Sequence, residues 1–284
     1  MTISVVTGAS SGIGLATVVR LAREGHTVFA AARNPDRAAD LQAAIAAAPD
    51  GVILPVILDV DDDASVAACF GSILAQGPID VLVNNAGISG AGSIEETSID
   101  DFRRQMETNF FGLLRCTQAV VGSMRERGSG AIVNISSIAG RFVRAGMGSY
   151  AASKHAVEAV SEALAQELAP FGVRVAVIEP GVIDTPIWSK SDAGPADSVY
   201  PLVGETTIRY FMKMLSEPTP ATAVSDAVVA AITEEPPRFR HPVGWDAETI
   251  TAKLPGITAD ELIAMASLDA DGWAAAFGAR LFPL

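Results

Sequence analysis

Short apolar runs alternate with stretches of helical periodicity over most of the chain. Continuous apolar runs of four to eight residues are typical of parallel strands buried on both faces. The predicted strands are Met1 to Val6, Thr27 to Ala32, Val52 to Leu58, Ile79 to Val83, Ala131 to Ile135, Val173 to Glu179 and a short last one at Arg238 to Val243. Between them, apolar residues recur at helical spacing, as at Val66, Cys69, Phe70 and Ile73. This alternation predicts an α/β fold with helices on both faces of a parallel sheet.

Two of the predicted helices have features beyond a single apolar face. The helix from about Asp100 to Arg127 carries adjacent apolar pairs, such as Phe110-Phe111, which spread apolar surface over more than one face. We therefore expect a homodimer or homotetramer that forms through residues 100–127 and 150–169. Asn109 lies among these apolar residues, where a buried amide needs a partner. In the second helix, the residues expected to pack on the core are Val157, Val160, Ala163, Leu164 and Leu168.

Length and composition limit the classes of function. The 284 residues, 49% of them hydrophobic, suffice for one large domain over residues 1–284. A net charge of −13 excludes nucleic acid and anionic membranes as main partners, because both repel an acidic surface. No long apolar run predicts a membrane span, and the first residues carry no targeting signal. Cys69 and Cys116 fit core positions, which favours a cytoplasmic protein, and the histidines lack metal-ligand spacing.

A glycine-rich turn, Thr7-Gly8-Ala9-Ser10-Ser11-Gly12-Ile13-Gly14, follows the first strand and precedes an amphipathic helix. Glycines let the backbone approach a pyrophosphate, which the free N–H groups of the helix N-terminus attract. The second strand ends at Ala32 and Arg33, where dinucleotide-binding folds contact the adenosine ribose. A guanidinium suits the 2′-phosphate of NADP, which is therefore favoured, with NAD as the alternative. A plain turn and an exposed loop arginine are the structural alternatives.

Polar residues follow other predicted strands and mark candidate chemistry. Asp59 and Val60, after the third strand, are candidates for adenine contacts, and Asn84-Asn85-Ala86-Gly87 ends the fourth. Amides at this edge either contact a ligand or brace the central strands. Tyr150 and Lys154 lie four residues apart, so they share one helix face. There the ammonium would lower the cost of ionising the phenol, as a tyrosine acid/base requires.

In combination, these residues resemble the short-chain dehydrogenase/reductase family. The match comprises, in family order, Thr7 to Gly14, Asp59, Asn84 to Gly87, Asn109, Ser137, Tyr150 with Lys154, and Pro180-Gly181 with Thr185. The run Arg240 to Ala247 is more weakly similar to retinol-type and 17β-hydroxysteroid-type dehydrogenases. The resemblance implies a Rossmann-type, doubly wound, mostly parallel seven-stranded sheet with helices on both faces.

The resemblance also implies a role for each matching residue. Tyr150 would exchange a proton with the substrate oxygen, which Ser137 would orient, and Lys154 would bind the nicotinamide ribose and keep Tyr150 acidic. Asn109 would kink its helix and hold a water that links Lys154 to solvent. Ser137 is preferred to Ser136 because the family separates serine and tyrosine by 13 positions, as 150 − 137 does here.

The implied cofactor site is larger. Gly8, Ser10, Ile13 and Gly14 would line the pyrophosphate, Asp59 and Val60 the adenine, Asn85 the ribose side, and Pro180, Val182 and Thr185 the carboxamide; Ser11, Gly12, Arg33, Ala86, Gly87 and Gly181 complete it with Tyr150 and Lys154. Ser11 stands where many NADP-preferring members have a basic residue, so Arg33 alone favours NADP.

These residues predict an NADP(H)-dependent oxidoreductase. It would transfer a hydride between nicotinamide and a carbonyl or secondary alcohol of a hydrophobic small molecule, with Tyr150 as general acid/base. An NAD(H)-dependent alcohol dehydrogenase is the alternative within enzymes. Outside enzymes, the alternative is a dinucleotide-sensing regulator without turnover.

The stretch from about 182 to 220 is expected to cover the substrate pocket as a lid. Its large apolar residues are Ile187, Trp188, Tyr200, Leu202, Val203, Tyr210, Phe211, Met212, Met214 and Leu215, with Gly194, Pro195 and Gly204 between them. Ile208, Phe211, Met212 and Leu215 would equally form the buried face of an ordinary helix. A C-terminal helical extension, about 246–284, would cap the pocket or cover a subunit interface.

Overall fold

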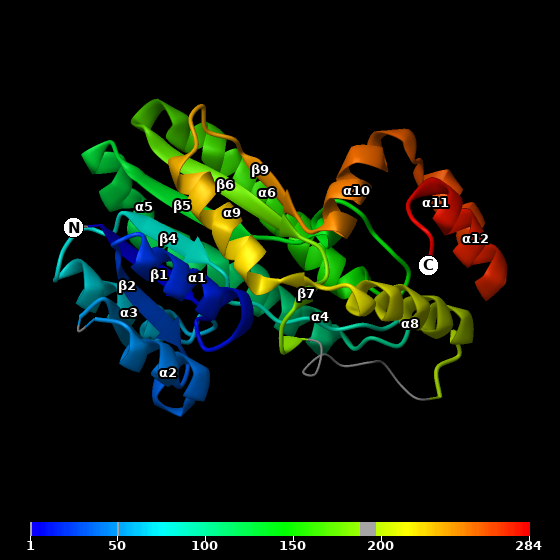
Figure 1. Ribbon diagram of the computed structural model, residues 1–284, viewed down its shortest axis with the longest axis horizontal. Coiled ribbons are helices and arrows are strands. Elements are labelled where there is room, and N and C mark those ends of the chain that lie inside the picture. The colour runs from blue at the N-terminus through cyan, green and yellow to red at the C-terminus, as the bar shows by residue number, and fades with distance from the viewer. Residues whose placement is uncertain (1, 50, 188–196) are drawn as a thin grey trace.

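A seven-stranded, entirely parallel sheet forms the centre of the molecule (Figure 1). The computed structural model describes residues 2–49, 51–187 and 197–284. The strands are β1 (Ile3–Thr7), β2 (Thr27–Ala32), β3 (Ile53–Ile57), β4 (Val81–Asn84), β5 (Gly130–Ile135), β6 (Val173–Pro180) and β9 (Arg240–Val243), in the spatial order β3-β2-β1-β4-β5-β6-β9. The order reverses between β1 and β4. In such a sheet, ligands bind beyond the carboxyl ends of the strands at that point.

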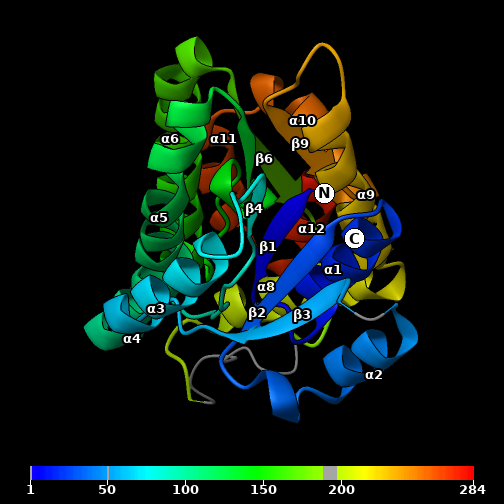
Figure 2. The same cartoon turned by 90° about the vertical axis from the view of Figure 1, so that its left-hand side faces the viewer.

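Helices cover both faces of the sheet, as the sequence predicts (Figure 2). One face carries α1 (Gly12–Arg23), α2 (Ala39–Ala47) and α9 (Ala221–Thr233), and the other carries α3 (Asp63–Leu74), α5 (Gly112–Arg127) and α6 (Gly148–Leu168). All four apolar residues predicted for the inner face of α3 are buried. Cys69 and Cys116 are buried and free, so they serve as core residues. Fold class and helix placement are therefore confirmed.

The long helix predicted from Asp100 is interrupted. It consists of α4 (Ile99–Met106), a π-helical turn at Glu107–Phe111 and then α5. A π turn inserts extra backbone and bends a helix, and such turns frequently mark functional sites. The apolar pairs that suggested a subunit interface divide between core and surface, because Leu113 and Val120 are buried while Phe111 is 44% exposed.

The C-terminal extension forms a separate layer with the lid helix (Figure 1). This layer contains α8 (Pro201–Ser216), α10 (Trp245–Lys253), α11 (Ala259–Ala266) and α12 (Ala270–Arg280). Tyr210 and Met214 of α8 pack with Trp273 and Phe277 of α12 in one apolar cluster. A short pairing of β7 (Ile183–Asp184) with β8 (Thr219–Pro220) closes the two ends of the lid segment. Trp188, Gly194 and Pro195 of that segment lie outside the described residues.

Two expectations about the sheet and α6 are wrong. The third strand is not covered on both faces, because β3 is the edge of the sheet and Ile57 at its end is 67% exposed. Ala163 is exposed and does not hold α6 to the core. The buried side of α6 instead runs through Val157, Ser161 and Leu168, whose spacing turns position 163 outward.

The buried face proposed for the lid helix is also wrong. Ile208 is 60% exposed, Met212 69% and Leu215 42%. The buried residues of α8 are Thr206, Tyr210 and Met214. The aromatic cluster with α12 explains the difference, because burying the Tyr210 ring there turns the aliphatic side of α8 to solvent.

Neither a membrane span nor a metal site is found within residues 2–49, 51–187 and 197–284. No helix there is long and apolar enough to cross a bilayer. No group of three or more His, Cys, Asp or Glu side chains there has the geometry to hold a metal ion. All three histidines are hydrogen-bonded: His26 Nδ1 to Ser4 Oγ at 2.7 Å, His155 Nδ1 to Ala151 O at 2.9 Å and His241 Nε2 to Arg238 O at 3.0 Å.

Candidate active site

One cleft at the carboxyl ends of the central strands gathers almost all the predicted site residues. Its volume is about 360 Å³, which is within the range of small-molecule sites. The predicted residues that line it are Gly8, Ser10, Ser11, Gly12, Ile13, Gly14, Arg33, Asp59, Val60, Asn85, Ala86, Gly87, Ser137, Tyr150, Lys154, Pro180, Gly181, Val182 and Thr185. Among the residues given a catalytic or cofactor-binding role, Asn109 is the one that does not line the cleft.

The glycine turn has the geometry that a pyrophosphate requires. Gly8 has a φ of +67°, and a side chain at Gly14 would come within 2.3 Å of the Gly8 carbonyl oxygen. Asn85 Nδ2 braces the turn by donating to Thr7 O at 2.9 Å and Gly8 O at 3.2 Å. Ser11, which begins α1, makes no side-chain cap within the described residues, so the first N–H groups of the helix stay available. The chain therefore fits a dinucleotide at this turn.

The adenosine end of the cleft is bordered by one cation and by carboxylates. Arg33 follows β2 directly and is exposed at the cleft wall. Asp59 and Asp61, which follow β3, also line the cleft, and the charge of Arg33 acts on Asp61. Burial raises the pKa of Asp61, and its hydrogen bond from Thr108 and the nearby charge of Arg33 oppose that rise. The Arg33 guanidinium is placed to bind a 2′-phosphate of the adenosine ribose. The residue that follows β2 is not a carboxylate, which would accept a hydrogen bond from a 2′-hydroxyl.

Tyr150 and Ser137 both line the cleft, and their side chains are hydrogen-bonded. Burial raises the pKa of the Tyr150 phenol, and its hydrogen bond with Ser137 opposes the rise. Ser137 also accepts from Ala139 N at 3.1 Å, which fixes the start of the short helix η3 (Ile138–Gly140). The neighbouring Ser136 also lines the cleft, but its side chain interacts with Glu158, where it opposes the rise in the pKa of that carboxyl. The geometry thus agrees with the preference for Ser137.

Lys154 lies one turn after Tyr150 on α6 and is almost completely buried. Its Nζ donates to Ile135 O at 2.9 Å and is 5.8 Å from the centre of the Tyr150 ring. Burial lowers the pKa of Lys154 to about 8, and the charge of Glu158 opposes this fall. We expected Lys154 to lower the pKa of Tyr150, but the pKa of Tyr150 is raised. Burial is the largest influence on the pKa of each of the two groups.

Asn109 acts from behind the cleft wall. Its Oδ1 accepts from Ile88 N at 2.8 Å, and its Nδ2 donates to Ile88 O at 3.0 Å and Ser153 Oγ at 2.9 Å. These bonds pair the buried amide completely, as its apolar surroundings require. They also join the π turn to the loop after β4 and to α6, so Asn109 sets the position of cleft residues without bordering the cleft.

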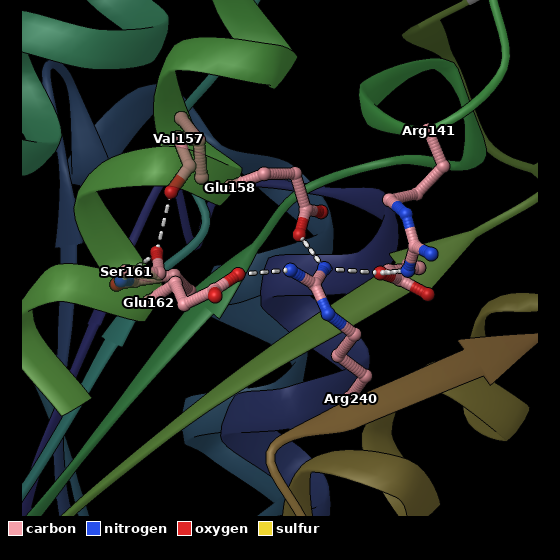
Figure 3. Close-up of polar contacts among 8 residues, drawn as sticks. Arg141, Val157, Glu158, Ser161, Glu162 and Arg240 are labelled. Carbon is pink, nitrogen blue, oxygen red and sulfur yellow. Dashed lines mark hydrogen bonds and ion pairs between the residues drawn. The ribbon is translucent and has the colours of Figure 1, made fainter. Parts of the chain in front are cut away.

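A network of ion pairs lies behind Lys154. The Arg240 guanidinium sits between carboxylates from α6 and β6 (Figure 3). It bonds Glu158, Glu162 at 3.0 Å and Glu179 at 2.7 Å. Arg141 pairs with Glu179 at 3.0 Å. Because Glu158 is one turn from Lys154 and raises its pKa, the network influences the charge in the cleft.

Two residues at the cleft were not assigned to the site from the sequence. Asp246, in the weakly similar Arg240 to Ala247 run, is buried and accepts from Val182 N at 2.8 Å. A Cβ at Gly181 would come within 1.9 Å of its Oδ1, so this pair fixes the backbone at the cleft wall. The second residue is Arg144, which lines the cleft from the loop before α6. No local pattern marks it, because its neighbours come from α8 and α12.

Comparisons with known proteins agree with this geometry. The family model described as short chain dehydrogenase matches residues 2–196. The uncharacterized oxidoreductase YusZ of Bacillus subtilis is 39% identical over 250 residues, which are 85% of this chain and 89% of the relative. Human retinol dehydrogenase 8 is 37% identical over 209 residues, 72% of this chain and 67% of the relative.

A solved structure extends the agreement to most of the chain. The short-chain dehydrogenase from Streptomyces avermitilis has a TM-score of 0.82 at 36% identity and covers 91% of this chain and 94% of its own. The chain is thus similar to known short-chain dehydrogenases in sequence and in structure, in agreement with its parallel sheet, glycine turn and cleft. The chain belongs to the short-chain dehydrogenase/reductase family, whose members are oxidoreductases that bind a nicotinamide dinucleotide and act on CH–OH or C=O groups.

Proposed function

We propose that the protein is an NADP(H)-dependent oxidoreductase that interconverts a carbonyl and a secondary alcohol on a hydrophobic small molecule. The observation that carries this proposal is the meeting of Ser137, Tyr150 and Lys154 in one cleft with the glycine turn. Apolar side chains from Phe142, Met147 and neighbouring elements line the rest of the cleft. They supply the surface that a hydrophobic substrate needs.

The residues of the cleft divide the chemistry between them. The bound dinucleotide supplies or accepts the hydride at the nicotinamide C4. Ser137 donates a hydrogen bond to the substrate oxygen and steadies its developing charge. Tyr150 gives its proton to the same oxygen during reduction and takes it back during oxidation. The ammonium of Lys154 stabilises the phenolate that remains after the transfer. A phenol whose pKa is raised by burial starts the reduction in its protonated form.

The remaining predicted residues are assigned to cofactor binding and positioning. We assign Gly8, Ser10, Ser11, Gly12, Ile13 and Gly14 to the pyrophosphate, Arg33, Asp59 and Val60 to the adenosine, Asn85, Ala86 and Gly87 to the ribose side, and Pro180, Gly181, Val182 and Thr185 to the carboxamide. Asn109 is a positioning residue, because it holds Ile88 and Ser153 and does not border the cleft. The apolar pairs between residues 100 and 127, of which Phe111 in the π turn is exposed, remain the basis for expecting a homodimer or homotetramer. The free, buried cysteines suit the cytoplasm.

Arg33→Ala is expected to remove most of the preference for NADPH over NADH. The guanidinium would form a charge-assisted contact with the 2′-phosphate, which NADH lacks, so we expect NADPH affinity to fall about tenfold or more and NADH affinity to stay within about twofold. Dissociation constants for both cofactors, from the change in nicotinamide fluorescence, measure the ratio. Arg37→Ala is the matched control, since Arg37 is also exposed but lies outside the cleft. An unchanged ratio in Arg33→Ala would instead favour the NAD(H)-dependent alternative.

The activity should also fall at alkaline pH as Lys154 loses its proton. With a pKa of about 8, this ammonium is present below that pH and lost above it. We therefore expect kcat/KM for NADPH, which reports the free enzyme, to fall about tenfold per pH unit above about pH 8. Lys154→Met should lower activity throughout and lose this inflection. A wild-type profile that is flat to about pH 10 would contradict the role of Lys154.

The function itself is tested by NADPH consumption with aldehydes, ketones and quinones of graded size. Turnover of at least one apolar carbonyl compound, with stoichiometric formation of the alcohol, is the expected result. Tight NADPH binding without turnover of any compound would favour a dinucleotide-sensing regulator instead.

A further inference from the structure

Arg144 places a cation at the substrate end of the cleft. It belongs to the loop between η3 and α6 and borders the same cavity as Ser137 and Tyr150. Its guanidinium carbon lies 3.8 Å from the centre of the Tyr210 ring and 5.6 Å from that of Trp273. These rings come from α8 and α12, so the lid and the C-terminal extension hold the guanidinium in place. Stacking on a ring face leaves the edge of the guanidinium, with its N–H groups, for hydrogen bonding.

The charge of Arg144 is not balanced by a carboxylate within the described residues. Its Nη2 donates to Thr206 O at 3.3 Å, and its Nε is buried without a partner among the described residues. Arg23, Arg33 and Arg37 also make no ion pair with a described residue, but all three are exposed to water. Burial lowers the pKa of Arg144 to about 10, so it remains a cation at neutral pH. A cation in such surroundings is costly unless an anion joins it.

The surroundings of Arg144 also indicate what kind of anion fits. The neighbouring cleft residues Phe142, Met147, Val182 and Phe211 are apolar. A monoanion would neutralise the single guanidinium, whereas a phosphate dianion would leave one negative charge among apolar side chains. The planar edge of a guanidinium matches the two oxygens of a carboxylate.

We propose that Arg144 binds the carboxylate of the substrate, which is then an apolar carbonyl compound, or the matching alcohol, that also carries an acid group. This inference rests on the proposed function, because it assumes that the reacting oxygen lies at Ser137 and Tyr150. The acid group lies at the far end of the substrate, beside α8 and α12. The C-terminal extension thereby takes part in substrate selection through the rings that hold Arg144.

Binding and turnover test this proposal separately. The probes for binding are 4-phenylbutyrate and its primary amide, titrated calorimetrically in the presence of NADP⁺. The wild-type protein should bind the carboxylate about 10- to 100-fold more tightly than the amide, as for a hydrogen-bonded charge pair. Arg144→Met should remove this preference, and Arg144→Lys, which keeps the charge without the planar edge, should retain part of it. Arg209→Met, an exposed arginine of α8 paired with Glu205 and Asp271, is the matched control.

For turnover, the matched substrates are 4-oxo-4-phenylbutyrate and its methyl ester. The wild type should show a higher kcat/KM for the acid, and in Arg144→Met the ratio of kcat/KM for acid over ester should fall to about one. The melting temperature and NADPH affinity of each variant show whether it is folded. Equal binding of carboxylate and amide by the wild type, or no carboxylate binding up to about 10 mM, would overturn the proposal. If the wild type prefers the carboxylate and Arg144→Met does not, but neither compound is turned over, the role of Arg144 stands and the proposed function fails. A preference that persists in Arg144→Met would overturn the role of Arg144.

Discussion

Tyr150→Phe should lose at least about 10²-fold in kcat while the fold and cofactor binding remain intact. The change removes one oxygen atom and with it the proton that the substrate oxygen receives. The ring of Tyr150 would still occupy its place on α6, and Ser137 would keep its bond from Ala139 N. Because the lost interaction acts only in the transition state, kcat should fall and the affinity for NADPH should not.

The measurement is a steady-state assay on whichever carbonyl compound the wild type reduces fastest. Tyr200→Phe is the matched control: its hydroxyl donates to Glu95 at the surface and lies outside the cleft, so turnover should stay within about twofold. Near-normal turnover by Tyr150→Phe would remove Tyr150 as the general acid. The same loss in both variants would point to a general effect of tyrosine removal on folding.

The sheet was predictable because its signal is local. In the middle of the sheet, a strand buried on both faces must be apolar throughout, and β1, β2 and β4 to β6 lie where the apolar runs predict them. The edge position of β3 was not predictable, because it depends on which strand lies beside which. The apolar sequence of β3, before Asp59, is equally compatible with a strand in the centre of a sheet.

The part of the site that lies in short motifs was predictable for the same reason. Spacing put Tyr150 and Lys154 on one helix face, the family resemblance added Ser137, and the glycines marked the turn; in the structure all of them line one cleft. Arg144 and Arg240 had no such signal, since their partners are distant in sequence. Arg240 and Glu158, for example, are 82 positions apart. Similarly, the buried side of α8 depends on contacts with α12, such as that between the rings of Tyr210 and Phe277. The sequence of α8 alone was also compatible with burial of Ile208, Met212 and Leu215, which are exposed.

Arg240→Met should destabilise the protein by about 3 kcal/mol, which lowers the melting temperature by roughly 5–10 °C. Glu179 is fully buried and Glu158 is 5% exposed, and Arg240 bonds both. Methionine keeps much of the volume but leaves two carboxylates near each other in the interior, where Arg141 still pairs with Glu179 and Lys154 still lies one turn from Glu158. Chemical denaturation gives the free energy of unfolding. Arg103→Met, at an exposed pair with Asp100, should change it by less than about 0.5 kcal/mol.

The destabilisation by Arg240→Met should depend on pH, because it leaves the buried carboxyl of Glu158 without the cation of Arg240. Burial raises the pKa of Glu158, and Arg240 opposes that rise, so its removal raises the pKa further. A carboxyl whose pKa is higher in the folded than in the unfolded state favours folding at low pH and disfavours it as pH rises through the folded value. The deficit of Arg240→Met should therefore be smaller at pH 5 than at pH 8. Adding Glu158→Gln should recover part of the loss at pH 8, because one buried charge is removed. A deficit that is constant with pH would mean that lost packing of the arginine side chain, and not unpaired charge, causes the instability.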